Sequence, residues 1–528
     1  MTRVATARLT GALGAPLAFP RMAALLLGTI AATGFRPLAL WPLALLAIGA
    51  LLALVERAPD WRRAALLGWI FGLGHFTLGN SWIATAFTYQ AEMPPALGWA
   101  AVPVLSLYLA VYPALAAAGA KLVAGRGGRA ALLLAFAGCW TVAEWLRGWV
   151  FTGYPWNPLG ISLLGPFDRP GLAAIAPWMG TYALSGVTVL LGCGLVGLLL
   201  ARRWLPALGA AILLALGMYL PAGEAAEGTV RFTLVQPDVR QERLDEPRFY
   251  EEDFQKTAAL SVAREPGERL VLWPESGVPD YLRSGYPRRY YLAATAFADP
   301  SLARRRIGEA IGPGSTLLTG TADLEIEDGR AVGAYNAVTA LDATGSIVGH
   351  YYKAHLVPYG EYLALRWLLE PLGATRLVPG AIDFLPGPGP RTIDLGTLGR
   401  AGVQICYEIV FSGEVVDDGN RPDYIFNPSN DGWFGPSGPP QHLAQARLRA
   451  IEEGLPVLRS TTPGISAVID ARGVVRDHIA RHVAGRMDGT IPPAAPPTPF
   501  AHLGNLLALG WALLFLALGL VVTRRSRG

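Results

Sequence analysis

The sequence has few charged residues, very little lysine and only three cysteines. Of its 528 residues, 52% are hydrophobic and 16% are charged, which is too apolar for an ordinary soluble protein. Lysine and arginine together number 44, and the only lysines are Lys121, Lys256 and Lys353. No basic cluster with interleaved aromatic side chains occurs, so the net charge of +4 does not indicate nucleic-acid binding.

The apolar residues gather in the first 221 residues and near the C-terminus. A helix needs about 20 mostly apolar residues to cross a bilayer. The expected membrane spans are 22–35, 38–55, 64–89, 97–120, 130–149, 172–201, 205–220 and 504–522. No clean small-residue cleavage site precedes a soluble segment after the first run, so we expect an uncleaved span there and not a signal peptide.

Basic residues predict the orientation of these spans, because cytoplasmic loops are enriched in lysine and arginine. Eight spans place both termini on the same side of the membrane. The basic residues on the two tails and on alternate loops are Arg3, Arg8, Arg57, Arg62, Arg63, Arg126, Arg129, Arg202, Arg203, Arg524, Arg525 and Arg527. We therefore expect cytoplasmic termini and an extracytoplasmic segment between the seventh and eighth spans.

The composition divides the chain into three parts: transmembrane helices 1–7 in residues 1–221, an α/β domain in 228–495, and a final transmembrane helix with a basic tail in 501–528. In the middle part, strand-like runs alternate with helical ones, as in sheets covered by helices. The expected strands are 231–237, 269–275, 316–322, 335–342, 402–408, 424–428, 456–462 and 465–470, and the expected helices are 248–263, 288–310 and 440–453.

Two ionisable residues, Glu144 and Arg147, lie inside the fifth expected span. Such residues are costly in a bilayer and suggest function, but mutual pairing at the interface explains them equally well. An aromatic loop at 154–157 follows on the expected outer side. It suits either an interfacial anchor or part of a lipid entrance.

Cys406 is the only cysteine of the α/β domain, since Cys139 and Cys193 lie in expected spans. The expected compartment is oxidising, yet Cys406 has no partner there for a disulfide. It is therefore either an inert core residue or a reactive nucleophile in the apolar run 402–411.

Three further residues suggest a reaction at that thiol. Lys353 is a lysine in an arginine-rich chain, which indicates a position that needs an ammonium group. Glu275 ends a strand-like run, where it either faces a cleft or caps a turn. Glu408 is two residues from Cys406, and strand alternation would put both side chains on one face. Glu408 would then either orient the site or pair with Lys353.

These residue types fit acyl transfer through a thioester. A free thiol has a pKa of about 8.5, so it is mostly protonated at neutral pH and needs a base. A glutamate can take that proton, and an ammonium can stabilise the oxyanion of a tetrahedral intermediate. A Cys–His pair is the competing arrangement, with His355 near Lys353 in sequence. No spacing indicates a metal or cofactor site, and we expect neither.

The order Glu275, Lys353, Cys406 resembles that of the nitrilase (carbon–nitrogen hydrolase) superfamily. Six segments together resemble the bacterial apolipoprotein N-acyltransferase family over nearly the whole chain. They are 144–157, 273–276 (WPES), 351–362, 402–411, 427–435 (NPSNDGWFG) and 441–470.

The resemblance implies an α-β-β-α sandwich attached to a bundle of eight transmembrane helices in a bacterial inner membrane, with the catalytic domain on the periplasmic side. It implies that Glu275 is the general base, Cys406 the nucleophile and Lys353 the oxyanion stabiliser. The supporting residues that it implies are Glu361, Tyr407 and Glu408.

The implied reaction is a ping-pong acyl transfer. A phospholipid, expected to be phosphatidylethanolamine, gives an acyl chain to Cys406, and the thioester acylates the α-amino group of the diacylglyceryl-cysteine of an apolipoprotein. The resemblance leaves the oligomeric state open, with a monomer as one option. One departure concerns the residues after Val235 and Gln236, where relatives often carry Lys-Trp and this chain reads PDVRQ.

Other interpretations remain open from the sequence. A membrane-tethered nitrilase or amidase would hydrolyse a soluble amide with the same triad, although eight spans are more than a tether needs. A transporter with an accessory domain fits less well, because no row of buried charges is evident. An inactive scaffold would not need all three triad residues. The apolar segment 361–373 is expected to be either a lipid-contacting arm or a helix packed on the domain.

Overall fold

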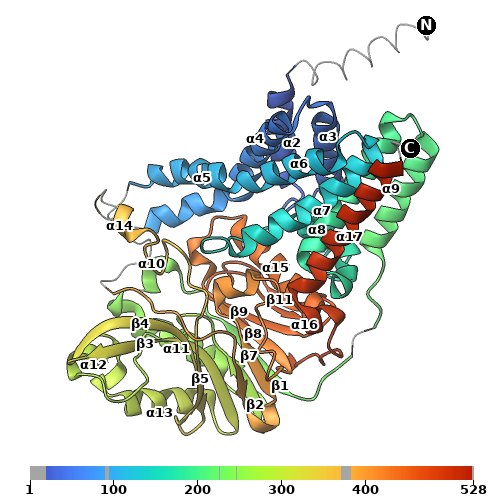
Figure 1. Cartoon of the computed structure of the whole chain (residues 1–528). Helices are drawn as coiled ribbons and strands as arrows, with labels where there is room; N and C mark the ends of the chain where they lie inside the picture. The colour runs from blue at the N-terminus through green and yellow to red at the C-terminus, as the bar shows by residue number, and fades with distance from the viewer. Residues whose placement is uncertain are drawn as a thin grey trace, which may run out of the picture. The chain divides into compact units, whose positions relative to one another are not determined.

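A computed structural model of the chain describes residues 19–89, 94–224, 226–244, 246–369, 371 and 382–525. The chain forms two compact units, which we describe separately. The helical unit comprises Met1–Ala84, Leu97–Leu220 and Thr498–Gly528, and the α/β unit comprises Thr85–Ala96 and Pro221–Pro497. Figure 1 shows their elements in the order of the chain.

The helical unit is built from apolar helices joined by short turns. They are α2 Pro20–Ala32, α3 Trp41–Arg57, α4 Trp61–Gly79, α5 Ala96–Leu109, α6 Val111–Ala124, α7 Gly128–Trp149, α8 Gly180–Leu200, α9 Trp204–Tyr219, α16 Pro499–Leu503 and α17 Asn505–Arg525. Within the described residues, four stretches are long and apolar enough to cross a membrane: Ala96–Ala124, Gly128–Trp149, Gly180–Leu200 and Asn505–Arg525. The other four expected spans stay predictions.

Two expected spans differ from the helices that form. The run at 64–89 is α-helical only as far as Gly79 and continues as the 3-10 helix η1, Ser81–Tyr89. The run at 172–201 starts with another 3-10 helix, Leu172–Trp178 (η3), and α8 begins at Gly180, whose φ is +76°. Hydropathy alone does not register such breaks, because the residues on both sides of them are equally apolar.

Glu144 and Arg147 fasten a loop to α7 and do more than pair with each other. Their charged atoms are 4.0 Å apart, and both side chains are buried. Arg147 donates hydrogen bonds to the carbonyl oxygens of Tyr154 (2.6 Å) and Trp156 (2.8 Å). Glu144 accepts one from the backbone N–H of Leu159 at 2.9 Å. The aromatic loop after α7 is thus held by buried charges.

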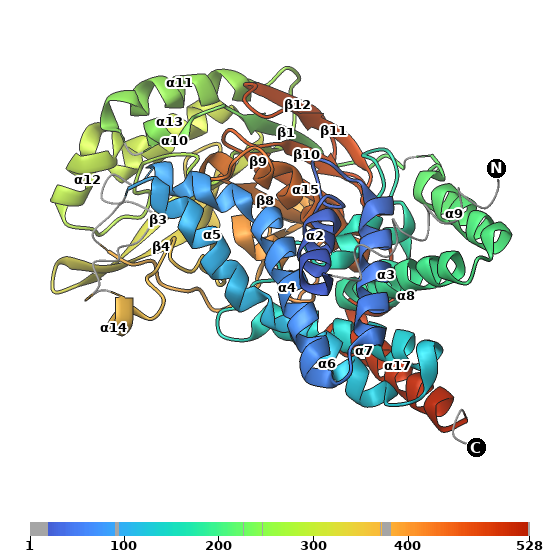
Figure 2. The same cartoon turned by 90° about the horizontal axis from the view of Figure 1, so that it is seen from above.

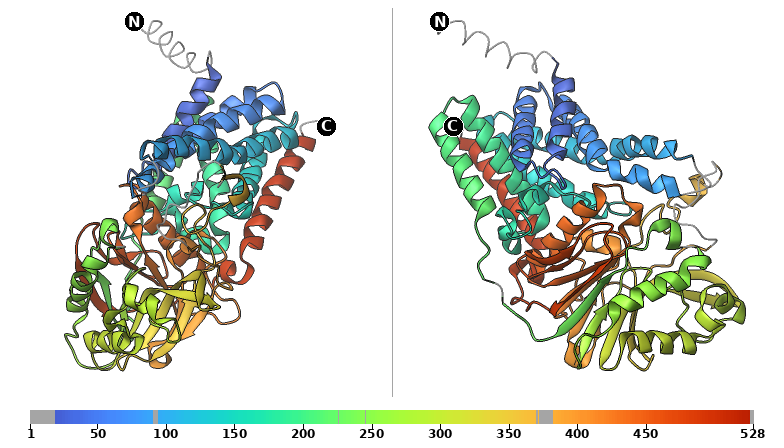
Figure 3. Two further views of the ribbon diagram at one scale, coloured as in Figure 1. Left: turned by 90° about the vertical axis from the view of Figure 1, so that its left-hand side faces the viewer. Right: turned by 180° about the vertical axis from the view of Figure 1, so that it is seen from behind.

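The α/β unit contains two six-stranded sheets, in the orders β12-β1-β2-β3-β4-β5 and β11-β10-β9-β8-β7-β6. Within each sheet, three adjacent strands run parallel: β1, β2 and β3 in the first, and β7, β8 and β9 in the second. The strands are β1 Arg231–Gln236, β2 Arg269–Leu272, β3 Ser315–Glu327, β4 Arg330–Asp342, β5 Ile347–Tyr352, β6 Thr392–Asp394, β7 Arg400–Val403, β8 Tyr424–Ser429, β9 Val457–Thr461, β10 Ser466–Ile469, β11 Val475–Ile479 and β12 Gly485–Thr490. Figure 3 shows both sheets from two further sides.

The two sheets share one apolar core and are covered by helices on their outer faces. Leu234 and Leu318 of the first sheet belong to the same buried cluster as Val403 and Phe426 of the second. On the first sheet, α11 and α13 contribute to a second cluster around Trp273. Helix α15 contacts β9 and β10 of the second sheet. Figure 2 shows α11 and α13 on one side of the strands and α15 on the other.

The helices of the α/β unit are α10 Gln241–Leu244, α11 Tyr250–Ser261, α12 Arg288–Ala294, α13 Pro300–Ile311, α14 Arg366–Leu369 and α15 Gly438–Glu453. The single helix expected at 288–310 is therefore divided. Asp299 accepts hydrogen bonds from the N–H groups of Ser301 and Leu302, so it caps a new helix that begins at Pro300. The layers are those of the expected α-β-β-α sandwich.

Candidate active site

The structure brings together Glu275 and Lys353, which lie just beyond the ends of strands, and Glu361, which lies in the segment after β5. Glu275 follows β2 by three residues, and Lys353 directly follows β5. Lys353 Nζ lies 2.9 Å from Glu361 Oε2 and 3.9 Å from Glu275 Oε1. The three side chains are buried, with exposed fractions of 1% for Lys353, 7% for Glu275 and 5% for Glu361. An ammonium flanked by two carboxylates is thus shielded from solvent.

Asn336 on β4 fixes both carboxylates. Its Nδ2 donates to Glu275 Oε1 and to Glu361 Oε1, each at 2.8 Å, and its carbonyl oxygen accepts from the N–H of Lys353 at 2.9 Å. The backbone N–H of Asn430 donates to the other oxygen of Glu275 at 2.6 Å. The sequence interpretation assigned no role to Asn336 or Asn430; Asn430 lies in the segment NPSNDGWFG, which was a signal for it, whereas no signal marks Asn336.

Cys406 is buried and close enough to this cluster to interact electrostatically with Glu275 and Lys353. Burial raises the pKa of the Cys406 thiol, the carboxylate of Glu275 raises it further, and the ammonium of Lys353 lowers it, with a net rise above the ordinary value. Burial would lower the pKa of Lys353, but Glu361 and Glu275 outweigh burial and raise it. Burial raises the pKa of Glu275 against the effect of Lys353. The resting site therefore holds a protonated thiol, a cation and a carboxyl group with increased basicity.

The expected strand at 402–408 is wrong beyond Val403. There β7 ends, and Cys406 begins the 3-10 turn η8, Cys406–Val410, with a φ of +50°. A non-glycine residue in this left-handed conformation costs about 1–3 kcal/mol and persists only where its surroundings fix it. Because both residues lie in this turn, Cys406 and Glu408 do not share one face of a strand, as alternation predicted.

Glu408 ties the turn of Cys406 to the segment after β5. Its Oε1 accepts from the hydroxyl of Tyr351 (2.7 Å) and from the N–H groups of Ala354 (2.7 Å) and His355 (3.2 Å). Its Oε2 accepts from the N–H of Ile405 at 2.7 Å. Of the two roles left open, these contacts support orientation of the site.

Tyr407 occupies the same turn, where its ring packs edge-on against Phe411 with centroids 5.1 Å apart. The ring of His355 stacks on Phe411 at 4.0 Å, and its Nε2 lies 3.3 Å from Glu414 Oε2. His442 Nε2 lies 3.0 Å from the backbone carbonyl oxygen of Cys406. His355 therefore contacts Phe411 and Glu414, and His442 contacts the backbone of Cys406. These contacts do not support either histidine as the base for the Cys406 thiol.

The segment 361–373 is only partly described, and its residues 370, 372 and 373 lie outside the described part of the chain. Leu363 is buried, whereas Trp367 on the short helix α14 is 76% exposed.

In the described part of the chain, no group of three or more His, Cys, Asp or Glu side chains has the arrangement of a metal site.

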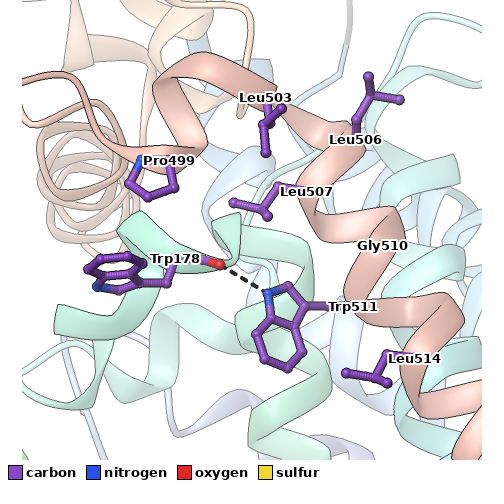
Figure 4. A pocket seen from close by; sticks show the side chains of 8 residues that line it. All are labelled: Trp178, Pro499, Leu503, Leu506, Leu507, Gly510, Trp511 and Leu514. Atoms are coloured by element: carbon purple, nitrogen blue, oxygen red, sulfur yellow. Dashed lines mark hydrogen bonds between the residues drawn. The ribbon is translucent and has the colours of Figure 1, made fainter.

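An apolar groove of about 590 Å³ lies in the helical unit, along the start of α17. Figure 4 shows that it is lined by Trp178 and by leucine side chains of α16 and α17, and that the indole N–H of Trp511 points to the carbonyl oxygen of Trp178. The nitrogen and oxygen of this hydrogen bond are 2.9 Å apart.

Two family models match the chain. One, described as Carbon-nitrogen hydrolase, covers residues 242–480, and the other, described as Apolipoprotein N-acyltransferase N-terminal domain, covers residues 27–194. Solved structures similar to the chain include an amidase from Nesterenkonia (16% identity, TM-score 0.35, covering 51% of this chain and 94% of the amidase). The nitrilase-superfamily protein Nit3 from Saccharomyces cerevisiae is also similar (18% identity, TM-score 0.36, 51% and 93%). By its match to the Carbon-nitrogen hydrolase family model, the α/β unit is a nitrilase-like domain.

Relatives match over almost the full length. An apolipoprotein N-acyltransferase from Rhodopseudomonas palustris is 34% identical, and the match covers 95% of this chain and 94% of the relative. One from Nitrosomonas europaea is 32% identical, with 95% and 97% covered. The chain belongs to the apolipoprotein N-acyltransferase family.

Proposed function

We propose that this acyltransferase moves a fatty acyl chain from a phospholipid, through a thioester on Cys406, to the α-amino group of the diacylglyceryl-cysteine of an apolipoprotein. The observation that carries the proposal is the buried ammonium of Lys353, which lies between Glu275 and Glu361 beside a buried thiol. The expected acyl donor is phosphatidylethanolamine.

The first half-reaction needs a base for the thiol. Glu275 takes the proton of Cys406, and Sγ attacks the ester carbonyl carbon of the phospholipid. Lys353 stabilises the oxyanion of the tetrahedral intermediate, for which a buried cation is effective because water does not screen it. The C–O bond then breaks, Glu275 returns the proton to the departing alkoxide, and a lysophospholipid leaves an acylated Cys406.

The second half-reaction uses the same groups in the same order. The neutral α-amino group of the apolipoprotein attacks the thioester carbonyl while Glu275 accepts a proton from the nitrogen. Lys353 again stabilises the oxyanion. The C–S bond breaks, and the proton passes from Glu275 to the sulfur. The products are an amide and the starting thiol, so one acyl chain moves and no cofactor is consumed.

Both substrates favour a site at a bilayer. Transfer of an acyl chain into water costs about 0.8 kcal/mol per methylene, so a water-soluble thiol would not reach it. A membrane-tethered amidase is not favoured, because the relatives named apolipoprotein N-acyltransferase match the helical unit as well as the α/β unit. We propose eight transmembrane helices, divided as 1–221 and 501–528, and a periplasmic catalytic domain in 228–495.

The orientation is tested by labelling single cysteines in spheroplasts with a membrane-impermeant maleimide. We expect Gly419→Cys, an exposed position of the α/β unit, to react with intact spheroplasts, and Pro59→Cys, in the turn after α3, to react only after lysis. The reverse pattern would place the termini outside the cytoplasm and overturn the proposed topology.

The thioester is tested by intact-protein mass spectrometry. After incubation of the full-length protein with phosphatidylethanolamine in detergent micelles, wild type should gain the mass of one acyl chain, released by hydroxylamine. Cys406→Ala should gain none, and the control Cys193→Ala, in α8, should behave as wild type. A folded wild-type protein without an adduct would sink the proposed function.

A further inference from the structure

The turn that carries Cys406 has two backbone carbonyl oxygens that are bound by side chains. They belong to Gln404 and Cys406 and flank Ile405. Gln404 accepts from Asn427 Nδ2 at 2.6 Å. Cys406 accepts from His442 Nε2 at 3.0 Å. The conformation between them is the left-handed one, with a φ of +50° at Cys406. Two side-chain donors thus fix the segment at which the backbone leaves the sheet.

The two donors come from different elements but share one partner. Asn427 lies on β8, and His442 lies in the first half of α15. Arg459, on β9, is the cross-strand partner of Asn427 and donates from one NH group to Asn427 Oδ1. Its other NH group lies 3.0 Å from His442 Nδ1. A single guanidinium therefore orients both side chains that hold the turn.

Asp431 balances the charge of that guanidinium. Both of its carboxylate oxygens lie 2.8 Å from the same nitrogen of Arg459. Although burial raises the pKa of Asp431, the charge of Arg459 and the contact with His442 hold it well below the usual range. Asp431, His442 and Arg459 are fully buried, with exposed fractions of 0%. The Arg459–Asp431 ion pair is therefore buried in the core, and its contacts fix its geometry.

His442 has the protonation state needed to donate a hydrogen bond to the carbonyl oxygen of Cys406. Burial, together with the nearby Arg459, lowers the pKa of His442, so the ring is neutral. Its one hydrogen is on Nε2, because the Cys406 carbonyl oxygen can only accept. Nδ1 then faces the Arg459–Asp431 pair, 3.0 Å from the guanidinium and 3.0 Å from Asp431 Oδ1.

We propose that His442 and Asn427 are positioning residues, which the Arg459–Asp431 pair orients to clamp the carbonyls of Cys406 and Gln404. The clamp holds the left-handed turn and so keeps the thiol beside Glu275 and Lys353. This inference rests on the proposed nucleophilic role of Cys406. It assigns a function to side chains that do not touch the reacting atoms.

The test compares two replacements of similar length at one position. Glutamine can donate a hydrogen bond from its amide, and methionine cannot. We expect His442→Met to slow acylation of Cys406 by phosphatidylethanolamine about 100-fold, because a misplacement of about 1 Å can cost this much. His442→Gln should recover most of the rate. The phosphatidylethanolamine concentration that gives the half-maximal rate should not change, since the clamp does not contact the phospholipid.

A second position keeps the test informative if the methionine variant does not fold. Asn427→Asp preserves the shape and the contact with Arg459 but removes the donor to Gln404. We expect it to slow acylation while the thermal midpoint stays close to that of wild type. His478→Met, at an exposed histidine on β11, is the matched control and should have no effect.

Alkylation of Cys406 by iodoacetamide gives a readout that does not depend on acyl transfer. When the clamp is lost, the thiol leaves Glu275, and its alkylation profile should move from high pH toward that of an ordinary thiol. Failure of the proposed function would appear as wild type without an acyl adduct, and the clamp would still be judged by this profile. Wild-type acylation and alkylation in both His442→Met and Asn427→Asp would overturn the inference.

Discussion

Glu275→Gln should slow acylation of Cys406 about 10²–10⁴-fold, the usual contribution of a general base. The same change should speed alkylation of the thiol by iodoacetamide at pH 8. The charge of Glu275 raises the pKa of Cys406, so its removal lowers that pKa and increases the thiolate fraction. The measurement is the rate of each reaction on the purified full-length protein, from mass spectrometry.

Slower acylation together with faster alkylation distinguishes loss of the base from loss of the fold. In wild type the raised thiol pKa shifts the alkylation profile to high pH, and in Glu275→Gln the profile should move to lower pH. Glu265→Gln, at a carboxylate with a 78% exposed side chain, is the matched control and should change neither rate. A parallel fall of acylation and alkylation would contradict the assignment of Glu275 as the base.

Lys353→Met should both inactivate and destabilise the protein. Loss of a buried oxyanion stabiliser typically costs about 10²–10³ in rate. The variant also leaves Glu275 and Glu361 buried without their shared cation, and loss of one partner of a buried ion pair typically costs about 3–5 kcal/mol. The measurements are the acylation rate and the thermal midpoint in detergent micelles.

A second substitution separates the two effects. In the double variant Lys353→Met, Glu361→Gln, one of the unpaired charges is removed, so the thermal midpoint should recover while acylation stays slow. Lys256→Met, on α11, is the control at a lysine outside the site, which donates to the backbone carbonyl oxygen of Asp238, and should affect neither quantity. Recovery of activity together with stability in the double variant would show that Lys353 has only a structural role.

Local sequence signals predicted an α/β domain and marked Glu275, Lys353 and Cys406, whereas the α-β-β-α sandwich and the place of Glu361 followed from the family resemblance. Apolar runs and turns mark the strands, and a lysine among arginines marks Lys353. The partners of these residues leave no local signal. Asn336 is 61 residues from Glu275 in the chain, and Asn430 is 155 residues away, so only the folded sheets bring them into contact.

The turn at Cys406 was missed for a different physical reason. The run 402–411 is apolar throughout, and its alternation is compatible with a continuous strand. The strand ends because the buried side chains of Asn427, His442 and Glu408 bind backbone groups of residues 404–406. Tertiary hydrogen bonds here outweigh local propensity, and a sequence pattern does not contain them.

Glu408 joins two segments that belong to different layers of the sandwich. It binds the segment after β5, which belongs to the first sheet, and the turn after β7, which belongs to the second. The proposed base and cation thus lie on one layer and the proposed nucleophile on the other. Under the proposed mechanism neither layer alone contains a complete reaction centre, and sliding of one sheet over the other would separate the base from the nucleophile. We therefore expect turnover to require that the two sheets stay aligned.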